Sequence, residues 1–372
     1  MNRRPYASLY VHVPFCSRKC DYCAFYSLPD SPEARVLRQR YLQHLEREFQ
    51  RFRHDCQPLR SIYLGGGTPS VLSEAELATL LNLIAQSFAR EKDCEWSIEA
   101  NPESLTREKL ALLLSAGVNR LSLGIQSFAA DCRQLLGRRG TLENLAAIQL
   151  ECRRQGLENL NLDLIYAIPG QRLADFQDDL RQACEGYCPA HLSIYALIIE
   201  PETKISKRLQ ADCDEEMFLQ FWHCADNLCE QFGLQRYEIA NFAIPGRECR
   251  HNFEIWHGQT YLGCGPAAVS FDGHNRRANP ANLQSWLADA PGSDDILPEE
   301  ERAAEILAFG LRTVAGWDYQ QFQALTGWNA RILRGAAIDQ LCREGLLVDT
   351  GKILHPTRKG LLFNDNILAA LL

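Results

Sequence analysis

The chain has 372 residues, of which 46% are hydrophobic and 23% charged, as in an ordinary globular protein with one large domain and a smaller one. Its net charge of −8 argues against nucleic acid as the main partner. No apolar stretch approaches a membrane span, and fifteen cysteines, an odd number at irregular spacing without a signal peptide, do not make a disulfide framework. We therefore expect a protein of the reducing cytoplasm, with no transmembrane segment and no nucleic-acid partner.

The first predicted strand alternates apolar residues from Leu9 to Val13 and ends at Pro14. Three cysteines follow at spacings of four and three: Cys16, Cys20 and Cys23. Such a triplet is expected by chance only about 0.02 times in this composition. Three thiolates on one loop can hold a four-iron cluster and leave one iron open for a small molecule. A structural zinc site would need a fourth ligand, and His12 is the only histidine in this stretch.

Strand and helix patterns then alternate through the first half of the chain. Strands are predicted at 9–13, 61–64, 95–99, 120–125, 160–165 and 191–197. Helices are predicted at 33–52, 73–88, 106–115, 141–156, 172–185 and 214–232, with Thr141 as the cap of the fourth. Alternation without hairpin signals predicts a parallel sheet with helices outside. Six units rather than eight suggest a barrel that is open on one side.

The remainder of the chain has a different pattern. Residues 236–279 are rich in Gly, Asn, His and aromatics, so we expect an irregular segment near the barrel mouth. Residues 289–298 are predicted to form a linker, followed by helices at 299–313, 318–326 and 329–344 and a hairpin around Thr350-Gly351. We thus expect a barrel core at 1–200, a barrel extension at 201–290 and a small winged-helix-like domain at 298–372. The acidic balance favours a protein-contact or lid role for this domain over DNA binding.

Polar residues occur just after the predicted strands, where a parallel barrel builds its sites. Gly65-Gly66-Gly67-Thr68 lets backbone amides approach a ligand, although a glycine triplet is more often only a turn. Glu99 could accept hydrogen bonds from ribose hydroxyls or could pair with a lysine or arginine. Gln126 follows the fourth strand. Asp163 interrupts an apolar strand, which is costly unless the carboxylate is paired or functional.

The cysteine spacing resembles that of the radical S-adenosylmethionine (SAM) superfamily. The context Tyr10-x-His12-x-Pro14-Phe15-Cys16, with Leu136-Gly-Arg138 and the run from Leu162 to Gly170, resembles oxygen-independent coproporphyrinogen III oxidase and its relative, the heme chaperone HemW. The resemblance implies an α/β fold, a partial (β/α)6 barrel, with a [4Fe-4S] cluster on Cys16, Cys20 and Cys23. It implies that residues around the cluster-bound SAM are Tyr10, Tyr22, Gly66 and Glu99. It implies that a second SAM position is formed by Gly67, Thr68, Gln126, Arg138, Asp163 and Ala196.

Two features separate the two relatives. The oxidases have a longer segment before the cluster and a fourth cysteine two residues after the third, whereas here fifteen residues precede Cys16 and Phe25 occupies the fourth position. The segment from Cys249 to Trp256 resembles the HemW motif His-Asn-x-x-Tyr-Trp, which implies that His251 binds heme. Ile255 replaces the tyrosine of the motif. Without the resemblance, a structural His-Asn pair is the ordinary interpretation.

Three hypotheses follow from the sequence. The first is a chaperone that binds the cluster and SAM and transfers heme to an acceptor protein. The second is a radical SAM enzyme of porphyrin biosynthesis, an oxidase-like protein that acts on a tetrapyrrole and needs an electron donor. The third is a non-catalytic iron–sulfur protein whose C-terminal domain binds another protein.

Overall fold

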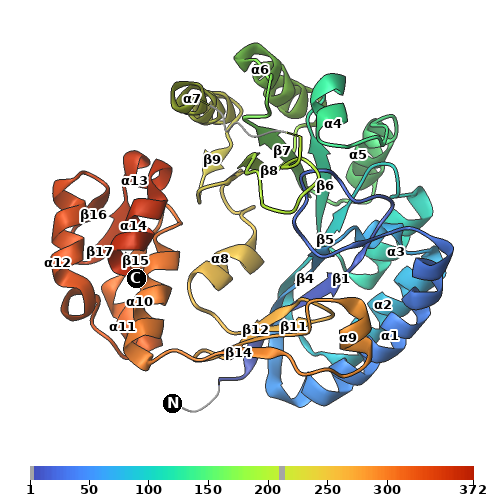
Figure 1. Cartoon of the computed structure of the whole chain (residues 1–372), viewed down its shortest axis with the longest axis horizontal. Helices are drawn as coiled ribbons and strands as arrows, with labels where there is room; N and C mark the ends of the chain where they lie inside the picture. The colour runs from blue at the N-terminus through green and yellow to red at the C-terminus, as the bar shows by residue number, and fades with distance from the viewer. Residues whose placement is uncertain (1–3, 209–213) are drawn as a thin grey trace.

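A twelve-stranded mixed sheet forms the body of the protein in the computed structural model, which describes residues 4–208 and 214–372. The strand order is β14-β13-β12-β11-β1-β4-β5-β6-β7-β8-β10-β9. Its central six strands are parallel and follow the chain: β1 (Tyr6–Val13), β4 (Cys56–Gly66), β5 (Arg90–Ala100), β6 (Arg120–Gln126), β7 (Asn159–Tyr166) and β8 (His191–Ala196). They confirm the predicted partial barrel, an α/β fold whose sheet is not closed (Figure 1).

Helices cover the outer face of these strands (Figure 1). They are α1 (Pro32–Phe52), α2 (Glu74–Ser87), α3 (Arg107–Ala116), α4 (Ala130–Leu135), α5 (Leu145–Arg154), α6 (Leu173–Arg181) and α7 (Glu215–Gln231). The apolar faces predicted from the helical spacing pack on the sheet, and the largest core cluster joins the strands to these helices. Ser73 and Glu76 form the expected capping box, and Gly117 ends α3 with a φ of 99°.

Three local features of this region differ from the prediction. Helix α5 begins at Leu145 with Asn144 at its N-cap, so Thr141 is not the cap; a turn at residues 142–144 separates Thr141 from the helix. Helix α4 was missed, because its six residues are too few to show a helical repeat. The helix predicted at 172–185 changes after Arg181 into a π-helical turn at residues 182–187.

The segment expected to be irregular instead extends both edges of the sheet. On one side, β10 (Asn241–Ala243) pairs antiparallel with β8 and with β9 (Gln235–Arg236). On the other side, β11 (Tyr261–Cys264) runs parallel to β1 and is followed by β12 (Val269–Phe271), β13 (Arg276–Ala278) and β14 (Ser293–Asp295). Strand β14 lies inside the predicted linker, after the short helix α9 (Leu283–Leu287). Strands of two to four residues are too short for a two-residue alternation to reveal.

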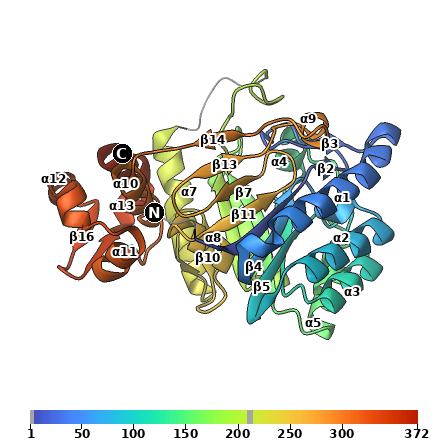
Figure 2. The same cartoon turned by 90° about the horizontal axis from the view of Figure 1, so that it is seen from below.

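Between the two edges, helix α8 (Arg250–Trp256) lies in the middle of the open ring (Figures 1 and 2). Its first turn contacts the inside of the sheet, since the backbone N–H groups of Arg250 and His251 donate to the two carboxylate oxygens of Glu95 on β5. Helix α8 therefore closes the end of the barrel at which the central strands begin.

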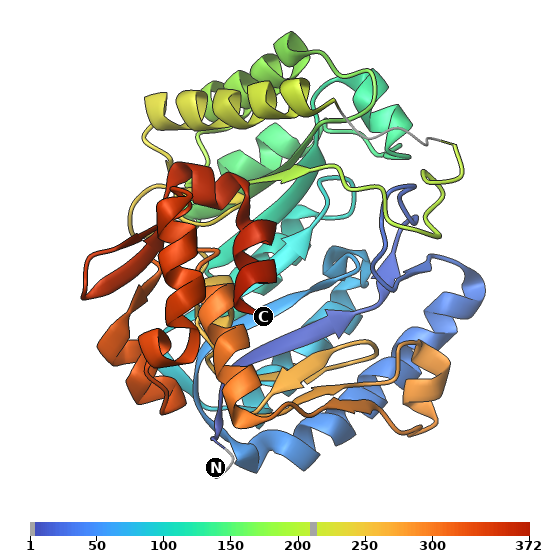
Figure 3. The same ribbon diagram turned by 60° about the vertical axis from the view of Figure 1, so that its left-hand side comes forward.

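The C-terminal residues, together with Phe271 of β12, form a second apolar cluster around Leu307, Trp317, Phe322 and Ile338. It is built from α10 (Glu299–Gly310), β15 (Trp317–Asp318), α11 (Tyr319–Thr326), α12 (Ala330–Arg343), β16 (Leu347–Asp349), β17 (Ile353–Pro356), α13 (Arg358–Leu362) and α14 (Asn364–Leu371). Strands β16 and β17 form the predicted hairpin, and β15 adds a third strand. Figure 3 shows these elements beside the barrel.

This arrangement matches the expected small winged-helix-like domain. The division into 1–200, 201–290 and 298–372 stays a prediction, because strands of the middle segment pair with both edges of the first. Across 4–208 and 214–372, no helix has the length and apolar character needed to cross a membrane.

Candidate functional site

The three clustered cysteines lie on a loop whose two ends are fixed together. Strand β2 (Phe15–Cys16) pairs with β3 (Leu28–Pro29). The N–H of Leu28 donates to the Pro14 carbonyl at 2.8 Å, and the N–H of Asp30 donates to the Cys16 carbonyl at 2.8 Å. Residues 17–27 thus form a closed loop at the carboxyl end of β1, as the sequence predicted.

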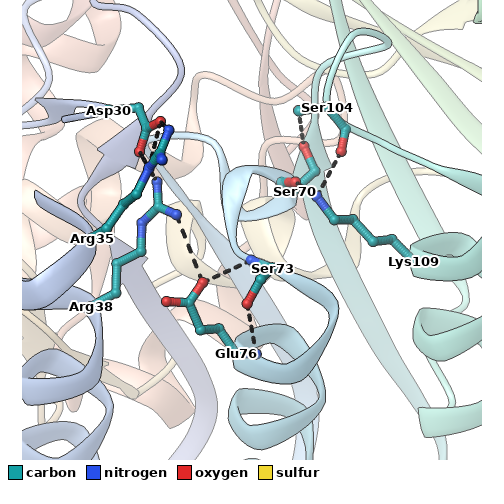
Figure 4. Close-up of polar contacts among 8 residues, drawn as sticks. All are labelled: Asp30, Arg35, Arg38, Ser70, Ser73, Glu76, Ser104 and Lys109. Atoms are coloured by element: carbon teal, nitrogen blue, oxygen red, sulfur yellow. Dashed lines mark hydrogen bonds and ion pairs between the residues drawn. The ribbon is translucent and has the colours of Figure 1, made fainter. Parts of the chain in front are cut away.

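An ion-pair network anchors the far end of this loop to the outer helices (Figure 4). Asp30 accepts hydrogen bonds from Arg35 and Arg38, each at 2.6 Å, and Arg38 also lies 3.7 Å from Glu76 at the start of α2. The hydrogen bond from Arg35 is the main cause of a lowered pKa for Asp30. Because the Arg38 side chain is only 6% exposed, this arginine holds α1, α2 and the end of the loop in one arrangement.

The glycine turn after β4 is a tight turn that also lines the site. Gly66 has a φ of +91°, a backbone conformation that favours glycine, and its N–H donates to Glu99 Oε2 at 3.2 Å. A Cβ at Gly67 would lie 2.5 Å from the Val13 carbonyl oxygen and 2.7 Å from that of Phe15. The turn therefore needs glycine because it packs directly against the start of the cysteine loop.

The next turn is held by a half-buried cation (Figure 4). Lys109 on α3 donates to the carbonyl oxygens of Ser70 at 2.7 Å and Ser104 at 3.0 Å. The Ser70 hydroxyl in turn accepts from the backbone N–H of Asn101 at 3.2 Å. These bonds join the turn after β4 to the turn after β5, so the two neighbouring strand ends keep a fixed spacing.

The cysteine loop and the strand ends enclose a cavity of about 500 Å³. The predicted residues that line it are Cys16, Cys20, Tyr22, Cys23, Gly66, Gly67, Thr68, Glu99, Gln126, Arg138, Asp163 and Ala196. Phe25, at the position of the missing fourth cysteine, also lines it and is 69% exposed. Six strands thus bring twelve of the fourteen predicted site residues to one cavity, and Tyr10 and His251 are the other two.

Glu99 forms no ion pair with the described residues. Its carboxylate accepts from the Tyr63 O–H at 2.9 Å and from the Gly66 N–H, so the alternative of a lysine or arginine partner does not hold. Burial, and then the neighbouring Asp163, raise the pKa of Glu99 to about 7, although the buried guanidinium of Arg120 acts on it from a distance and opposes this rise. The Glu99 carboxyl, which faces the cavity, is therefore hydrogen-bonded only by two neutral donors.

Asp163 lies on β7 and faces the same cavity. It accepts from Asn161 Nδ2 at 2.7 Å and from the Ser122 hydroxyl at 3.2 Å and 3.3 Å. Burial raises the pKa of its carboxyl above the ordinary value. The guanidinium of Arg120 opposes this rise, but Asp163 and Glu99 form no ion pair with the described residues. Two such carboxyl groups suit a positively charged ligand, such as one with an ammonium or a sulfonium group.

Hydrogen-bond donors are directed at the cysteines. Arg138 Nη1 lies 3.8 Å from Cys20 Sγ, and its Nη2 donates to Asn101 Oδ1 at 3.0 Å. The Thr68 hydroxyl donates to Cys16 Sγ at 3.6 Å. Gln126 has a φ of 65°, and its buried side-chain Oε1 has no partner among the described residues. Donors to sulfur stabilise thiolates, the form in which cysteine binds a metal.

The donor set fits a multi-iron cluster better than a single ion. Within the part of the chain that the structure describes, no three histidine, cysteine, aspartate or glutamate side chains gather tightly around one point. Three thiols spread around one cavity suit a four-iron cluster in which three of the irons each bind one protein sulfur. The glycine turn leaves room beside them, and the two carboxyl groups face that room.

Two predicted residues lie outside this cavity. Tyr10 is on β1 inside the barrel, with its O–H 3.1 Å from His12 Nδ1. His251 is 2% exposed, its Nδ1 lies 2.8 Å from the Ser61 hydroxyl, and its ring stacks on Tyr63 with centroids 5.2 Å apart. Burial, with a contribution from Arg120, lowers the pKa of His251 to about 3. Heme ligation by His251 stays a prediction, and it requires α8 to move before a porphyrin reaches this imidazole.

Three further residues of the cavity were not predicted from the sequence. Asn101, Tyr195 and Ile198 line it, and the last two are 43% and 68% exposed. Asn101 follows Glu99 by two residues at the end of β5, so the rule that found Glu99 could have found it. Nothing in the sequence marks Tyr195 and Ile198 as cavity residues, because apolar residues at the end of a strand usually pack in the hydrophobic core.

Known proteins resemble this chain over most of its length. Residues 10–183 match the radical SAM superfamily, and residues 297–363 match the HemN C-terminal domain. The structure of coproporphyrinogen III oxidase (HemN) from Escherichia coli, described as a radical SAM enzyme, covers 99% of this chain and 90% of its own with a TM-score of 0.86 and 24% identity. The likeness shows a shared fold. The fold and the cysteine loop together define a protein of the radical SAM class.

Relatives in sequence identify one family within this class. The heme chaperone HemW of Lactococcus lactis subsp. lactis (strain IL1403) is 32% identical over 374 residues, which cover 97% of this chain and 96% of that protein. The heme chaperone HemW of Escherichia coli (strain K12) is 32% identical over 377 residues, with 99% and 98% covered. The chain belongs to the heme chaperone HemW family.

Proposed function

We propose that this protein is a heme chaperone that binds a [4Fe-4S] cluster on Cys16, Cys20 and Cys23, binds SAM beside it, and transfers heme to an acceptor protein. The observation that carries the proposal is the shared cavity, in which three thiols face two carboxyl groups that form no ion pair with the described residues. Relatives named as heme chaperones over nearly the whole chain support the heme-transfer part.

The chain itself would position SAM. Glu99 and Asp163 would compensate the positive charges of its amino and sulfonium groups, and the Gly66-Gly67 turn would admit its amino-acid part beside the backbone. Thr68 and Arg138 would donate hydrogen bonds to the cluster thiolates and tune them. When bound, the cluster supplies an open iron for SAM and an electron for its cleavage. An electron donor is a further partner if SAM is cleaved.

The chaperone is favoured over an oxidase by the residue at the entrance of the cavity. Phe25 stands where the oxidases have a fourth cysteine, and its exposed ring gives the entrance an apolar surface instead of a thiol. The likeness to the oxidase structure concerns the fold alone. We also place the protein in a reducing cytoplasm, where the fourteen free cysteines of residues 4–208 and 214–372 would stay reduced.

The test is an anaerobic heme titration of the cluster-reconstituted protein, followed by Soret absorbance. We expect saturation near one heme per chain, and passage of that heme to a heme-free hemoprotein when the two are mixed. SAM cleavage that depends on an added porphyrinogen, without saturable heme binding, would support the enzyme instead. Absence of heme binding and of SAM cleavage would leave the non-catalytic interaction protein.

A further inference from the structure

A second cavity lies between the barrel edge and the C-terminal domain. It measures about 430 Å³ and is lined from one side by α7, β9 and β10 and from the other by β17 and α13. Figure 1 shows α13 on the side of the C-terminal domain that faces α7 and β9. Gln235, Arg236 and Val314 also line a neighbouring cavity of about 730 Å³, so the two cavities adjoin, and together they are called the groove below. This size suits a large cofactor-like ligand.

The groove is at the opposite end of the barrel from the cluster cavity. Its larger part is lined by Asn119 and Asn159, at the beginnings of β6 and β7, and by Asp93 in the first half of β5. The cluster cavity is lined by residues at the ends of the same strands. A ligand in the groove therefore occupies a site separate from the SAM site.

His355 on β17 has the arrangement of a metal-ligating histidine. It lines the groove and is half-buried, and its Nδ1 lies 3.1 Å from the carbonyl oxygen of Pro356. Because a carbonyl only accepts, Nδ1 must carry the proton, which leaves Nε2 with a lone pair. Nε2 forms no hydrogen bond with the described residues. Histidines that bind a metal through one nitrogen commonly donate the other N–H to a carbonyl in this way.

Other histidines of the protein lack this combination. Both nitrogens of His257 bond to backbone carbonyls, at 2.9 Å and 3.0 Å, and both nitrogens of His191 bond to side chains, at 2.6 Å and 2.8 Å. His251 has an unpartnered Nε2, but its ring is sealed inside the barrel. His274 lines a cavity of only about 150 Å³.

The walls of the groove suit an amphipathic planar ligand. Apolar contacts come from Leu234, Phe242 and Leu361. Arg236 is already engaged, since it lies 3.7 Å from the ring centroid of Trp222, 4.3 Å from that of Phe242, and 2.7 Å from Asp226. This arginine therefore serves as a rigid wall and not as a free charge.

Arg358 is the available cation of the groove. Its side chain is 80% exposed, and its partner Glu230 lies 3.8 Å away with 70% exposure. An exposed pair of this kind contributes at most about 1 kcal/mol, so Arg358 can exchange it for a ligand carboxylate. A half-buried imidazole, an apolar wall and an exposed guanidinium match the iron, the macrocycle and a propionate of heme.

We infer that heme binds in this groove, with Nε2 of His355 as an axial ligand and Arg358 paired to a propionate. The inference rests on the proposed function and specifies where the cargo is held. It places heme against the C-terminal domain and on the far side of the barrel from SAM. His251 then acts from the barrel floor as a positioning residue for α8, without touching the iron.

The experiment uses full-length, cluster-loaded protein and ferric heme. His355→Ala is expected to weaken binding at least about tenfold and to shift the Soret band, as loss of a ligand should. Arg358→Glu is expected to weaken binding less, with a reduced dependence on salt. His223→Ala, at an exposed position of α7, is the matched control and should titrate like the wild type. Retained cluster absorbance and circular dichroism show that each variant is folded.

A second substitution tests directly whether His355 is the axial ligand of the iron. His355→Cys should still bind heme but give the spectrum of a thiolate-ligated iron, whereas His251→Cys should not. Wild-type affinity and an unchanged spectrum in both His355 variants, with binding lost in His251→Ala, would overturn the inference and leave the chaperone function standing. Failure of the wild type to bind heme would instead refute the proposed function, and the inference with it.

Discussion

Replacing Glu99 with glutamine tests whether the cluster cavity holds a carboxyl that burial keeps protonated. Glutamine keeps the shape and an oxygen that can accept from Tyr63 and Gly66, but it removes the titration. The pKa of Glu99 is raised from 4.5 to about 7 in the folded protein. Its protonated form is thus favoured by folding, so its contribution to stability is complete below the unfolded pKa and is lost as pH rises from there through about 7.

The magnitude follows from the size of the shift. At about 1.4 kcal/mol per pKa unit, a shift of about 2.5 units corresponds to about 3 kcal/mol of lost stability above pH 7. Most of this loss falls between pH 5 and pH 8. Between pH 5 and pH 8, the free energy of unfolding of the wild type should therefore fall by most of this amount relative to that of Glu99→Gln. A cationic ligand in the cavity should restore part of the loss, because it favours the carboxylate.

The assay is chemical denaturation of both proteins from pH 5 to pH 8, with and without SAM. Glu48→Gln is a matched control, because burial raises the pKa of Glu48 to about 7 as well, while its carboxylate bonds to Gly265 and Asn279 away from the cavity. It should change the pH dependence similarly but leave the SAM effect intact. Equal pH profiles for wild type and Glu99→Gln would refute the reasoning.

Three further predictions concern the surroundings of the cluster. Alanine at any one of its three cysteines should abolish the iron–sulfur absorbance after reconstitution, whereas the exposed Cys188→Ala should retain it; retention in all three single variants would refute the cluster assignment. Gly67→Ala should lower the free energy of unfolding by about 1–3 kcal/mol and weaken SAM binding measured by calorimetry, because its Cβ meets two carbonyl oxygens. Gly186→Ala, with nothing within 4 Å, is the control, and equal effects would contradict the packing argument. Arg38→Met should lower stability by about 1–3 kcal/mol in denaturation, by leaving Asp30 and the cysteine loop less firmly held, and an unchanged midpoint would show that the network is dispensable.

Local sequence signals were sufficient for the central architecture. Each of the six parallel strands carries enough consecutive apolar residues to show its pattern, and Ser73 and Gly117 mark helix ends through short-range hydrogen bonds and a backbone angle. The loop with three cysteines was also readable, because its ligands are neighbours in the chain. Since parallel strands end on one rim, the order of the strands alone predicted that Glu99, Gln126 and Asp163 would meet.

The short strands at the two edges of the sheet could not be predicted from the sequence, for a physical reason. Strands β9 to β14 have two to four residues each and exist because β8 and β1 offer unpaired edges to them. Their stability comes from hydrogen bonds to partners far away in the sequence, so no local pattern marks them. The beginning of α5 was also unpredictable from local sequence, because a turn sets it and Thr141, the nearest residue that could cap the helix, does not.

Taken alone, the sequence determined the class of fold, the position of the cysteine loop and most of the residues around its cavity, because these follow from periodicity and from spacing along the chain. Only the tertiary structure decided what each polar side chain faces. It placed two neutral donors, and no cation, on Glu99. The His251 ring lies inside the barrel and stacks on Tyr63. His355 instead lines the groove between the barrel and the C-terminal domain. Burial and partners depend on segments that meet only when the chain folds, and these non-local contacts leave no trace in the spacing of residues.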